Sequence, residues 1–435
     1  MYDVAVVKYD KPLESLKKAI NWAGGLDGIS LQSRVVIKPN ILVWLEGDDF
    51  PKYGALSTAR MIEDLVVLLK EIGVQRIVIL EGISFGKLQA AAKGMGFDIL
   101  GKRYGVEVVD VWKSEFVKIN VGGAKFSISK EFIDADFRIS VPVLKTHSQA
   151  IVSLGIKNLK GLIDQSSRKL FHNANPHTDL DYHLARLVEV VPTCFTIIDG
   201  IYTLERGPSL IGDARRSDII IASKDLLSAD KVAAAMLGIS PQTVPHLLLA
   251  SERKNRPTDL SDIKFKGDID ISLAAKWHEW RPARSQADDM PLLLAMAGVK
   301  GVTVPPMDKS VCTYCVGSFY FFVNMGLLMA SNKDKSFDDI EFLVGKNQDS
   351  TGKHKHTMLL GQCQVNRNEN NPLIRHCVKV GGCPPREQDY LDACKEVGIE
   401  LPAGFPASAE NAARLFLMPK YKGKQGFDET FYQIQ

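Results

Sequence analysis

Three consecutive segments decide the fold: Arg34-Val-Val-Ile-Lys-Pro39, Ser57-Thr-Ala-Arg-Met-Ile-Glu-Asp-Leu-Val-Val-Leu-Leu-Lys70 and Arg76-Ile-Val-Ile-Leu80. The first and third are short apolar runs typical of buried strands. The middle segment has the apolar spacing of a helix, with Ser57 as its expected cap. Strands that are almost wholly apolar and alternate with helices indicate a parallel sheet covered on both faces.

The same alternation continues along the chain. Further apolar strands are predicted over 106–110, 137–141, 194–199 and 218–222, a helix over 229–237, and an antiparallel hairpin over 116–121 and 125–129 joined at Gly122-Gly123. The sequence therefore predicts an α/β fold, a doubly wound and mostly parallel sheet with helices on both faces. We expect this domain to cover 1–250, a connecting segment 251–299, and a cysteine-bearing segment 300–435.

Composition excludes several classes of protein. The chain has 435 residues, of which 45% are hydrophobic, and its 54 basic residues nearly balance 51 acidic ones. A net charge of +3 gives no field that would favour nucleic-acid binding. The longest apolar run, 316–330, is shorter than the roughly 20 residues that span a bilayer. We therefore expect no membrane span and, because no leader or lipidation motif is recognised, a cytoplasmic protein.

Polar residues follow several predicted strands. In an open parallel sheet, ligands bind outside the carboxyl ends of the strands, so these residues are expected to line one crevice. Lysines at this crevice would favour a small anionic substrate. The predicted substrate-binding residues are Lys38, Asn40, Glu81, Lys157, Asn158 and Lys160, and the predicted catalytic residues are Lys145, His147 and Asp199.

The roles of the catalytic candidates follow from their side chains. His147 follows a strand and can act as an acid or a base near neutral pH, with Asp199 as its orienting partner. The structural alternative is that residues at strand ends cap helices and solvate loops. No Walker loop, dinucleotide-binding glycine motif or serine-hydrolase elbow is present, which argues against nucleoside triphosphates, dinucleotides and serine hydrolysis.

Four motifs carry a family resemblance. They are Val35-Val-Ile-Lys-Pro-Asn40, Val141-Pro-Val-Leu-Lys-Thr-His147, Gly155-Ile-Lys-Asn-Leu-Lys-Gly161, and Ile198-Asp-Gly-Ile201 with Arg206-Gly-Pro208. In this order they resemble the domain of unknown function 362 family, a prokaryotic group often associated with iron-sulfur clusters. Many members carry two four-cysteine runs that this chain lacks, so it looks like a branch with dispersed C-terminal cysteines. The resemblance implies the α/β fold and a cluster, but no substrate.

Six of the seven cysteines lie in the last third of the chain. A Cys-x-x-Cys pair directs two thiolates at one centre, and a Gly-Gly-Cys-Pro turn presents a third beside free backbone N–H groups. The predicted ligands of a 4Fe-4S cluster are Cys312, Cys315, Cys363 and Cys383. Cys377, Cys394 and His376 are reserves. Structural zinc is the alternative, although zinc ribbons usually have two Cys-x-x-Cys pairs, and a disulfide framework is disfavoured by the odd cysteine count.

These patterns predict an iron-sulfur protein that is a redox or lyase-type enzyme for a small anionic substrate. Four cysteine ligands would favour electron transfer, with a redox partner protein, whereas three would leave an open iron that acts as a Lewis acid. Two alternatives belong to other classes. One is a non-enzymatic electron or cluster carrier, and the other is a zinc-stapled transferase or hydrolase.

Overall fold

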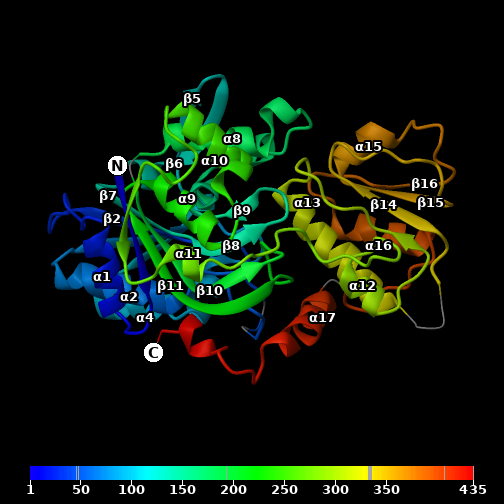
Figure 1. Cartoon of the computed structure of the whole chain (residues 1–435). Helices are drawn as coiled ribbons and strands as arrows, with labels where there is room; N and C mark the ends of the chain where they lie inside the picture. Colours follow the sequence, from blue (N-terminus) through cyan, green and yellow to red (C-terminus); the bar gives the residue numbers. More distant parts are fainter. Residues whose placement is uncertain (46, 48, 193, 332–335, 406, 435) are drawn as a thin grey trace. The chain divides into compact units, whose positions relative to one another are not determined.

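The structure, a computed structural model, describes residues 1–45, 47, 49–192, 194–331, 336–405 and 407–434. The chain forms two compact units (Figure 1). Unit 1 contains Met1–Leu170, Asp181–Arg281 and Lys420–Gln435, and unit 2 contains Phe171–Leu180 and Pro282–Pro419. The division differs from the predicted ranges in three respects: the predicted connecting segment is split at Arg281, the last residues belong to unit 1, and a short segment from the middle of the chain belongs to unit 2.

Unit 1 is built on a large, mostly parallel sheet. The strands of unit 1 are β1 (Tyr2–Lys8), β2 (Arg34–Pro39), β3 (Arg76–Glu81), β4 (Glu107–Asp110), β5 (Phe116–Val121), β6 (Ala124–Ser129), β7 (Phe137–Val141), β8 (Val143–His147), β9 (Ile151–Ser153), β10 (Phe195–Glu205), β11 (Asp213–Ser223) and β12 (Ile263–Gly267). The sheet has the order β12-β1-β11-β10-β7-β2-β3-β4, with β8 beside β10 and β9. Strands β10, β7, β2, β3 and β4 run parallel, and β11 is antiparallel to both its neighbours. The predicted α/β class is confirmed.

Helices cover both faces of this sheet. They are α1 (Glu14–Trp22), α2 (Ala59–Glu71), α3 (Leu88–Gly94), α4 (Phe97–Tyr104), α5 (Lys130–Ile133), α6 (Gly155–Asn158), α7 (Gln165–Leu170), α8 (Leu180–Val190), α9 (Leu226–Met236), α10 (Pro245–Arg253) and α11 (Ile271–Ala274), with short 3-10 turns η1 (Val111–Lys113), η2 (Leu159–Leu162), η4 (Pro241–Thr243) and η7 (Glu429–Tyr432). Helices α1, α2 and α4 lie on one side of the sheet, and α8, α9 and α10 lie on the other (Figure 1).

The burial of the central strands explains their composition. In β2, Val35, Val36 and Ile37 are all fully buried, although alternate side chains point to opposite faces of the sheet. Each such side chain contributes roughly 1.5–3 kcal/mol when it leaves water. Helix α2 starts one residue later than predicted: its cap is Thr58, whose side chain accepts a hydrogen bond from the Met61 N–H.

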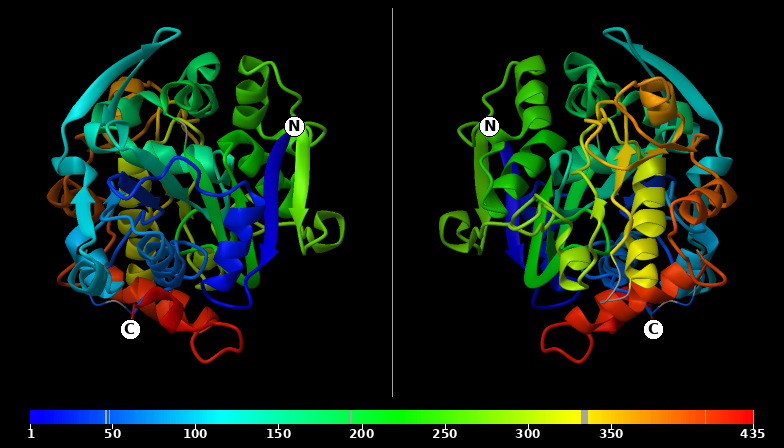
Figure 2. Two further views of the ribbon diagram at one scale, coloured as in Figure 1. Left: turned by 90° about the vertical axis from the view of Figure 1, so that its left-hand side faces the viewer. Right: turned by 90° about the vertical axis from the view of Figure 1, so that its right-hand side faces the viewer.

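The predicted antiparallel hairpin is present. Strands β5 and β6 pair from Phe116 opposite Ser129 to Val121 opposite Ala124. Gly122 and Gly123 both have positive φ angles, 52° and 84°, which glycine adopts without strain. Figure 2 shows this hairpin, in cyan, extending away from the sheet of unit 1.

The last residues of the chain pack into unit 1. Tyr432 is fully buried, and its hydroxyl accepts a hydrogen bond of 3.1 Å from the Gly54 N–H. The Tyr421 hydroxyl donates to the Gly212 carbonyl at 2.9 Å, and the Ile434 N–H donates to the Met95 carbonyl at 3.1 Å. Unit 1 is therefore completed by residues that follow unit 2 in the sequence.

Unit 2 has a parallel sheet of its own, which the sequence did not predict. Its strands, in spatial order, are β13 (Val302–Thr303), β14 (Ile340–Val344), β15 (His356–Leu360) and β16 (Cys377–Val380). Its helices are α12 (Leu292–Met296), α13 (Thr313–Ser318), α14 (Gly326–Ala330), α15 (Gln362–Asn368), α16 (Glu387–Glu396) and α17 (Ala407–Leu417), with the π-helical segment η5 (Phe319–Met325) and the 3-10 turns η3 (Pro176–Thr178) and η6 (Met418–Lys420).

One helical stretch of unit 2 is long and apolar. Segment Thr313–Ala330 comprises α13, η5 and α14, has a mean hydropathy of 1.3, and is 47% buried. By length and composition it is the one segment among the described residues that qualifies as a candidate bilayer span. Length and composition alone do not distinguish a span from the core helix of a soluble protein.

Candidate functional site

Two of the predicted strand-end residues form a buried ion pair in unit 1. Lys38 lies near the end of β2, and Glu81 is the last residue of β3. The Lys38 Nζ atom is 2.8 Å from Glu81 Oε1, and the two side chains are 1% and 3% exposed. Asn158 joins them, because its Oδ1 accepts a hydrogen bond from Lys38 Nζ at 3.3 Å. Burial lowers the pKa of Lys38, and the Glu81 charge opposes that shift.

The polypeptide comes unusually close to this ion pair. A Cβ atom on Gly161 would lie 2.8 Å from Lys38 Nζ and 3.0 Å from Glu81 Oε1. The carbonyls of Gly161 and Gly82 both accept hydrogen bonds of 2.9 Å from Arg168 Nη2. Arg168 is buried, and its guanidinium lies 4.2 Å from the centre of the Trp112 ring. Arg168 thus places a further cation beside the ion pair of Lys38 and Glu81. No sequence pattern indicated Arg168.

Lys145 is a second buried lysine. It is 1% exposed, and its Nζ donates a hydrogen bond of 2.6 Å to the Ala55 carbonyl. Burial, followed by the positive charge of Lys157, lowers the pKa of Lys145 well below its ordinary value. Among the described residues, no carboxylate forms an ion pair with it.

Lys157, in α6, is only partly buried. Burial lowers its pKa to about 7; the Arg168 charge lowers it further, and Asp181 opposes the shift. Within the part of the chain that the structure describes, its amine has no hydrogen-bond or ion-pair partner. Lys157 therefore offers an accessible amine beside other cations.

The remaining strand-end candidates have more local contacts. Lys160 is buried, and Asn40 is half-buried with its backbone N–H bound to Ser57 Oγ at 2.7 Å. The Nδ1 atom of the buried His147 accepts a hydrogen bond of 3.0 Å from the Gln149 N–H. The expected hydrogen bond between His147 and Asp199 stays a prediction. The contact of His147 given above is with Gln149, and Asp199 contacts Thr58 and Ile201.

Asp199 has a clear structural task. Its Oδ2 accepts hydrogen bonds from the Thr58 N–H at 2.7 Å and the Thr58 hydroxyl at 2.8 Å, and its Oδ1 accepts one from the Ile201 N–H at 3.1 Å. Burial raises its pKa. Because Thr58 caps α2, Asp199 ties the start of that helix to β10.

Asp230, in α9, was also missed by sequence reasoning. It is fully buried, and its two carboxylate oxygens accept hydrogen bonds from the Gly155 N–H at 2.7 Å and the Ile156 N–H at 2.8 Å. Burial raises its pKa to about 7. Asp230 therefore holds the start of α6, the helix that carries Lys157 and Asn158. No local motif marks it, since its partners are some 75 residues earlier in the chain.

The charges near the end of β2 are unbalanced. Lys38, Lys145, Lys157 and Arg168 influence one another, whereas Glu81 is the acid that pairs directly with one of them. The position also lies where the strand order reverses, since β2 has β3 on one side and the later strand β7 on the other. Ligands of open α/β sheets bind at such points. The arrangement is suited to an anion.

Unit 2 brings the four predicted cysteine ligands into one neighbourhood. Cys312 caps α13 and Cys315 lies in its first turn, Cys363 lies in the first turn of α15, and Cys383 follows β16. A hydrogen bond with Cys312, followed by burial and by the charges of the other three cysteines, raises the pKa of the Cys315 thiol. Four sulfurs from three separate segments are thus close enough to act on one another.

Backbone contacts hold these segments together. The Gly361 N–H donates to the Val380 carbonyl, and the Gln362 N–H donates to the Gly382 carbonyl, both at 2.8 Å. These bonds place the turn before Cys363 beside the turn before Cys383. A Cβ atom on Gly361 would lie 3.2 Å from the Cys315 sulfur, so the absence of a side chain there lets the sulfur approach.

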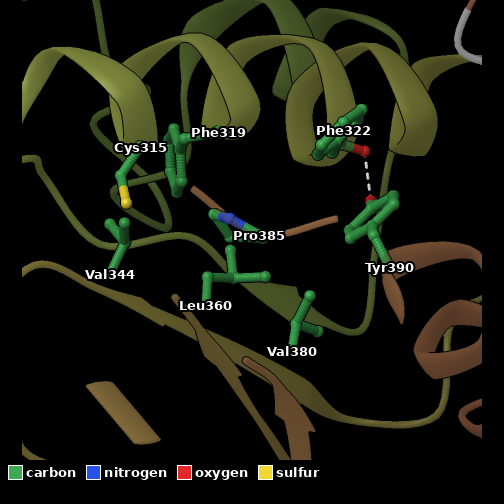
Figure 3. A pocket seen from close by; sticks show the side chains of 8 residues that line it. All are labelled: Cys315, Phe319, Phe322, Val344, Leu360, Val380, Pro385 and Tyr390. Atoms are coloured by element: carbon green, nitrogen blue, oxygen red, sulfur yellow. Dashed lines mark hydrogen bonds between the residues drawn. The ribbon is translucent and has the colours of Figure 1, made fainter. Parts of the chain in front are cut away.

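An apolar pocket adjoins Cys315. It has a volume of about 250 Å³ including space open to solvent, and is lined by Cys315, Phe319, Phe322, Val344, Leu360, Val380, Pro385 and Tyr390. Figure 3 shows the Cys315 sulfur beside Phe319 and above Val344 and Leu360. The Tyr390 hydroxyl donates a hydrogen bond to the Phe322 carbonyl in η5. The sulfur neighbourhood therefore has an apolar wall.

The described residues contain no group of three or more His, Cys, Asp or Glu side chains arranged to hold a metal ion. A single zinc ion would need its four sulfurs at about 2.3 Å from one centre. A 4Fe-4S core is larger than one ion and needs its sulfurs further apart. Both groups require the four sulfurs to lie near one another, so metal analysis of the purified protein distinguishes a cluster from zinc.

The reserve ligands have other surroundings. Cys377 starts β16, at the opposite end of the strand from Cys383, and packs against Leu343, Leu359 and Val365. Cys394 is fully buried in α16, and burial raises its pKa to about 12. His376 Nδ1 lies 2.6 Å from His356 Nδ1, and its Nε2 lies 3.0 Å from Glu396.

One family model matches the central part of the chain. The model of the domain of unknown function family DUF362 matches residues 35–235, which contain the central strands and the lysine cluster. This part of the chain is thus similar to that family, and it contains the four motifs on which the resemblance was based.

Two individual proteins are similar to the chain. A thylakoid-associated protein of Synechocystis is 24% identical over 259 residues, which are 58% of this chain and 78% of that protein. The lactate racemase apoprotein of Thermoanaerobacterium thermosaccharolyticum aligns over 96% of this chain and 91% of its own, with 12% identity and a TM-score of 0.36. Similarity at that TM-score establishes neither a shared fold nor a shared function.

Proposed function

We propose that the chain is an iron-sulfur protein and a redox or lyase-type enzyme that acts on a small anionic substrate. The proposed ligands of one 4Fe-4S cluster are Cys312, Cys315, Cys363 and Cys383. The observation that carries this proposal is the shared neighbourhood of these cysteines, in which three of them act on the thiol of the fourth. When bound, such a cluster supplies single-electron transfer or, with one iron left open, Lewis-acid activation.

The protein's own residues would bind and orient the substrate. The cluster of Lys38, Lys145, Lys157 and Arg168 supports an anion at the carboxyl ends of the strands in unit 1, because a bound anion would favour the protonated form of each lysine. Glu81 and Asn158 hold the Lys38 ammonium group in place, so this side chain need not move, at a cost in free energy, when a ligand binds. If the reaction transfers electrons, a redox partner protein belongs to this proposal.

The metal proposal is tested by purifying the full chain without oxygen and measuring iron, sulfide and zinc. We expect a brown protein with broad absorbance at about 400 nm that bleaches on reduction. Cys363→Ser should lose this absorbance. Cys377→Ser is the matched control, because both cysteines are half-buried in unit 2, and it should keep the absorbance. Stoichiometric zinc in a colourless protein, or absorbance that survives Cys363→Ser, would refute the cluster assignment.

The anion proposal is tested separately with inorganic phosphate. Phosphate should raise the unfolding temperature of the purified chain, since a ligand that binds only the folded state stabilises it. Lys145→Met should abolish this effect, whereas Lys118→Met, at an exposed position of the hairpin, should not change it. An equal phosphate effect in all three proteins would place the anion elsewhere.

We propose the cytoplasm as the compartment, because reduced thiols there can hold iron. The name of the Synechocystis relative suggests the alternative of association with a membrane surface. Fractionation of cells at low and high salt distinguishes the two: recovery with the membranes at both salt concentrations would contradict the cytoplasmic assignment.

A further inference from the structure

Lys157 differs from the other lysines around it. Lys38 is paired with Glu81, and Lys145 donates to the Ala55 carbonyl, so both amines are engaged. Lys157 keeps some exposure to solvent, and among the described residues its amine has no partner. Its helix is fixed at its start by Asp230, which accepts the Gly155 and Ile156 N–H groups. The fold therefore positions the Lys157 amine, which has no hydrogen-bond or ion-pair partner in the described part of the chain.

We infer that Lys157 is a nucleophile that condenses with the carbonyl group of a small aldehyde or ketone bearing a carboxylate or phosphate. The inference rests on the anion site proposed above and names its substrate class. Arg168, whose charge acts on Lys157, would supply the positive charge that attracts the anionic group of the substrate. A 2-oxo acid has both the carbonyl and the anion that this arrangement requires.

The charge state of the amine suits this chemistry. An amine attacks a carbonyl only when it is unprotonated, and a desolvated lysine next to other cations loses its proton more easily. With its pKa at about 7, Lys157 holds on the order of a thousand-fold more neutral amine at neutral pH than an ordinary lysine. The charged groups that act on Lys157 are Arg168, which lowers its pKa further, and Asp181, which opposes the shift, while Lys157 in turn lowers the pKa of Lys145.

The reaction is a condensation without a redox change. The lone pair of Lys157 Nζ forms a bond to the carbonyl carbon while the C=O π electrons move to oxygen, which takes up a proton. The resulting carbinolamine then loses the oxygen as water, and a C=N bond forms. The amine gives up two protons and the carbonyl its oxygen, so one molecule of water leaves.

The test uses glyoxylate, an aldehyde that carries a carboxylate, with the intact chain purified without oxygen. Cyanoborohydride reduces the imine to a stable secondary amine, and peptide mass mapping then locates the labelled lysines. We expect Lys157 to be labelled roughly ten-fold or more faster than the exposed Lys118 at neutral pH. Lys157→Arg keeps the positive charge and should lose this fast label. Acetaldehyde, which has no anionic group, should label Lys157 more slowly than glyoxylate does.

The outcomes separate this inference from the anion site itself. Fast labelling of Lys157 that phosphate suppresses supports both. If phosphate raises the unfolding temperature but Lys157 is labelled no faster than Lys118, the nucleophile is overturned and the anion site stands. If Lys157 is labelled fast and phosphate changes neither this rate nor the unfolding temperature, the reactive amine is supported and the anion site is overturned. Equal rates with glyoxylate and acetaldehyde would overturn the anionic substrate class.

Discussion

Replacing Glu81 by glutamine would leave the Lys38 ammonium buried without its negative partner. The two side chains are 1% and 3% exposed, and their charged atoms are 2.8 Å apart. Glu81 also accepts hydrogen bonds of 2.7 Å from the Ile41 and Gly82 N–H groups, so glutamine, with one acceptor oxygen, cannot satisfy all three donors. Removing one member of a buried ion pair costs about 3–5 kcal/mol.

The loss has an upper limit that depends on pH. Lys38 can give up its proton instead, and for an unfolded-state pKa of about 10.4 this costs about 4–5 kcal/mol at about pH 7 and about 2 kcal/mol at about pH 9. A lysine whose pKa is lowered by folding binds fewer protons in the folded state, so the stability of Glu81→Gln should increase as the pH rises toward that of the unfolded lysine. The deficit relative to the natural protein should therefore shrink between neutral and alkaline pH.

Urea unfolding followed by tryptophan fluorescence measures this effect in unit 1. All five tryptophans lie in this unit, and Trp112 contacts Arg168 beside the ion pair. The double variant Lys38→Met with Glu81→Gln removes the stranded charge and should recover about 2–4 kcal/mol relative to Glu81→Gln alone. A deficit that is the same at both pH values, or a double variant no more stable than the single one, would refute the reasoning.

Three other substitutions have defined outcomes. Asp199→Asn should lower the free energy of unfolding by about 1–3 kcal/mol, because hydrogen bonds to Thr58 are lost. Phosphate should still raise the unfolding temperature of this variant. Loss of phosphate binding at unchanged stability would instead indicate that Asp199 binds the ligand. Gly161→Ala should lower stability by about 1–3 kcal/mol and weaken phosphate binding, because its Cβ would lie 2.8 Å from Lys38 Nζ; calorimetric titration with phosphate measures the second effect. Because the pKa of Asp230 is raised from 3.8 to about 7, its protonation stabilises the fold below pH 3.8, and this contribution is lost as the pH rises to about 7. Asp230→Asn should therefore flatten the dependence of the free energy of unfolding on pH between these values. An unchanged slope would contradict the raised pKa of Asp230.

The fold class could be predicted because its signals are local. The apolar runs of β2, β3 and β7 and the helical spacing of α2 each lie within a few residues, so composition and periodicity suffice to recognise them. The sheet of unit 2 escaped prediction because β13 has two residues and no regular alternation precedes β14. The contribution of the last residues to unit 1 depends on contacts such as Tyr432 with Gly54, which no sequence pattern reveals.

The candidate site was only partly predictable for a similar reason. The rule that ligands bind at strand ends identified Lys38 and Glu81, which the structure joins in an ion pair. The same rule suggested a catalytic role for Asp199, whereas its observed partner is Thr58, 141 residues earlier in the chain. Arg168 was missed because it lies on a helix away from any strand end. The four cysteines lie in one neighbourhood, and their role as ligands stays a prediction.

The return of the C-terminal residues to unit 1 has a consequence for biosynthesis. Tyr421 and Tyr432 leave the ribosome after unit 2 has been made, yet their hydrogen-bond partners Gly212 and Gly54 are synthesised 209 and 378 residues earlier. Domains usually fold in the order in which they are synthesised. Here unit 2 can finish folding while unit 1 still waits for Tyr421 and Tyr432, so termination of the chain after Pro419 should harm unit 1 more than unit 2.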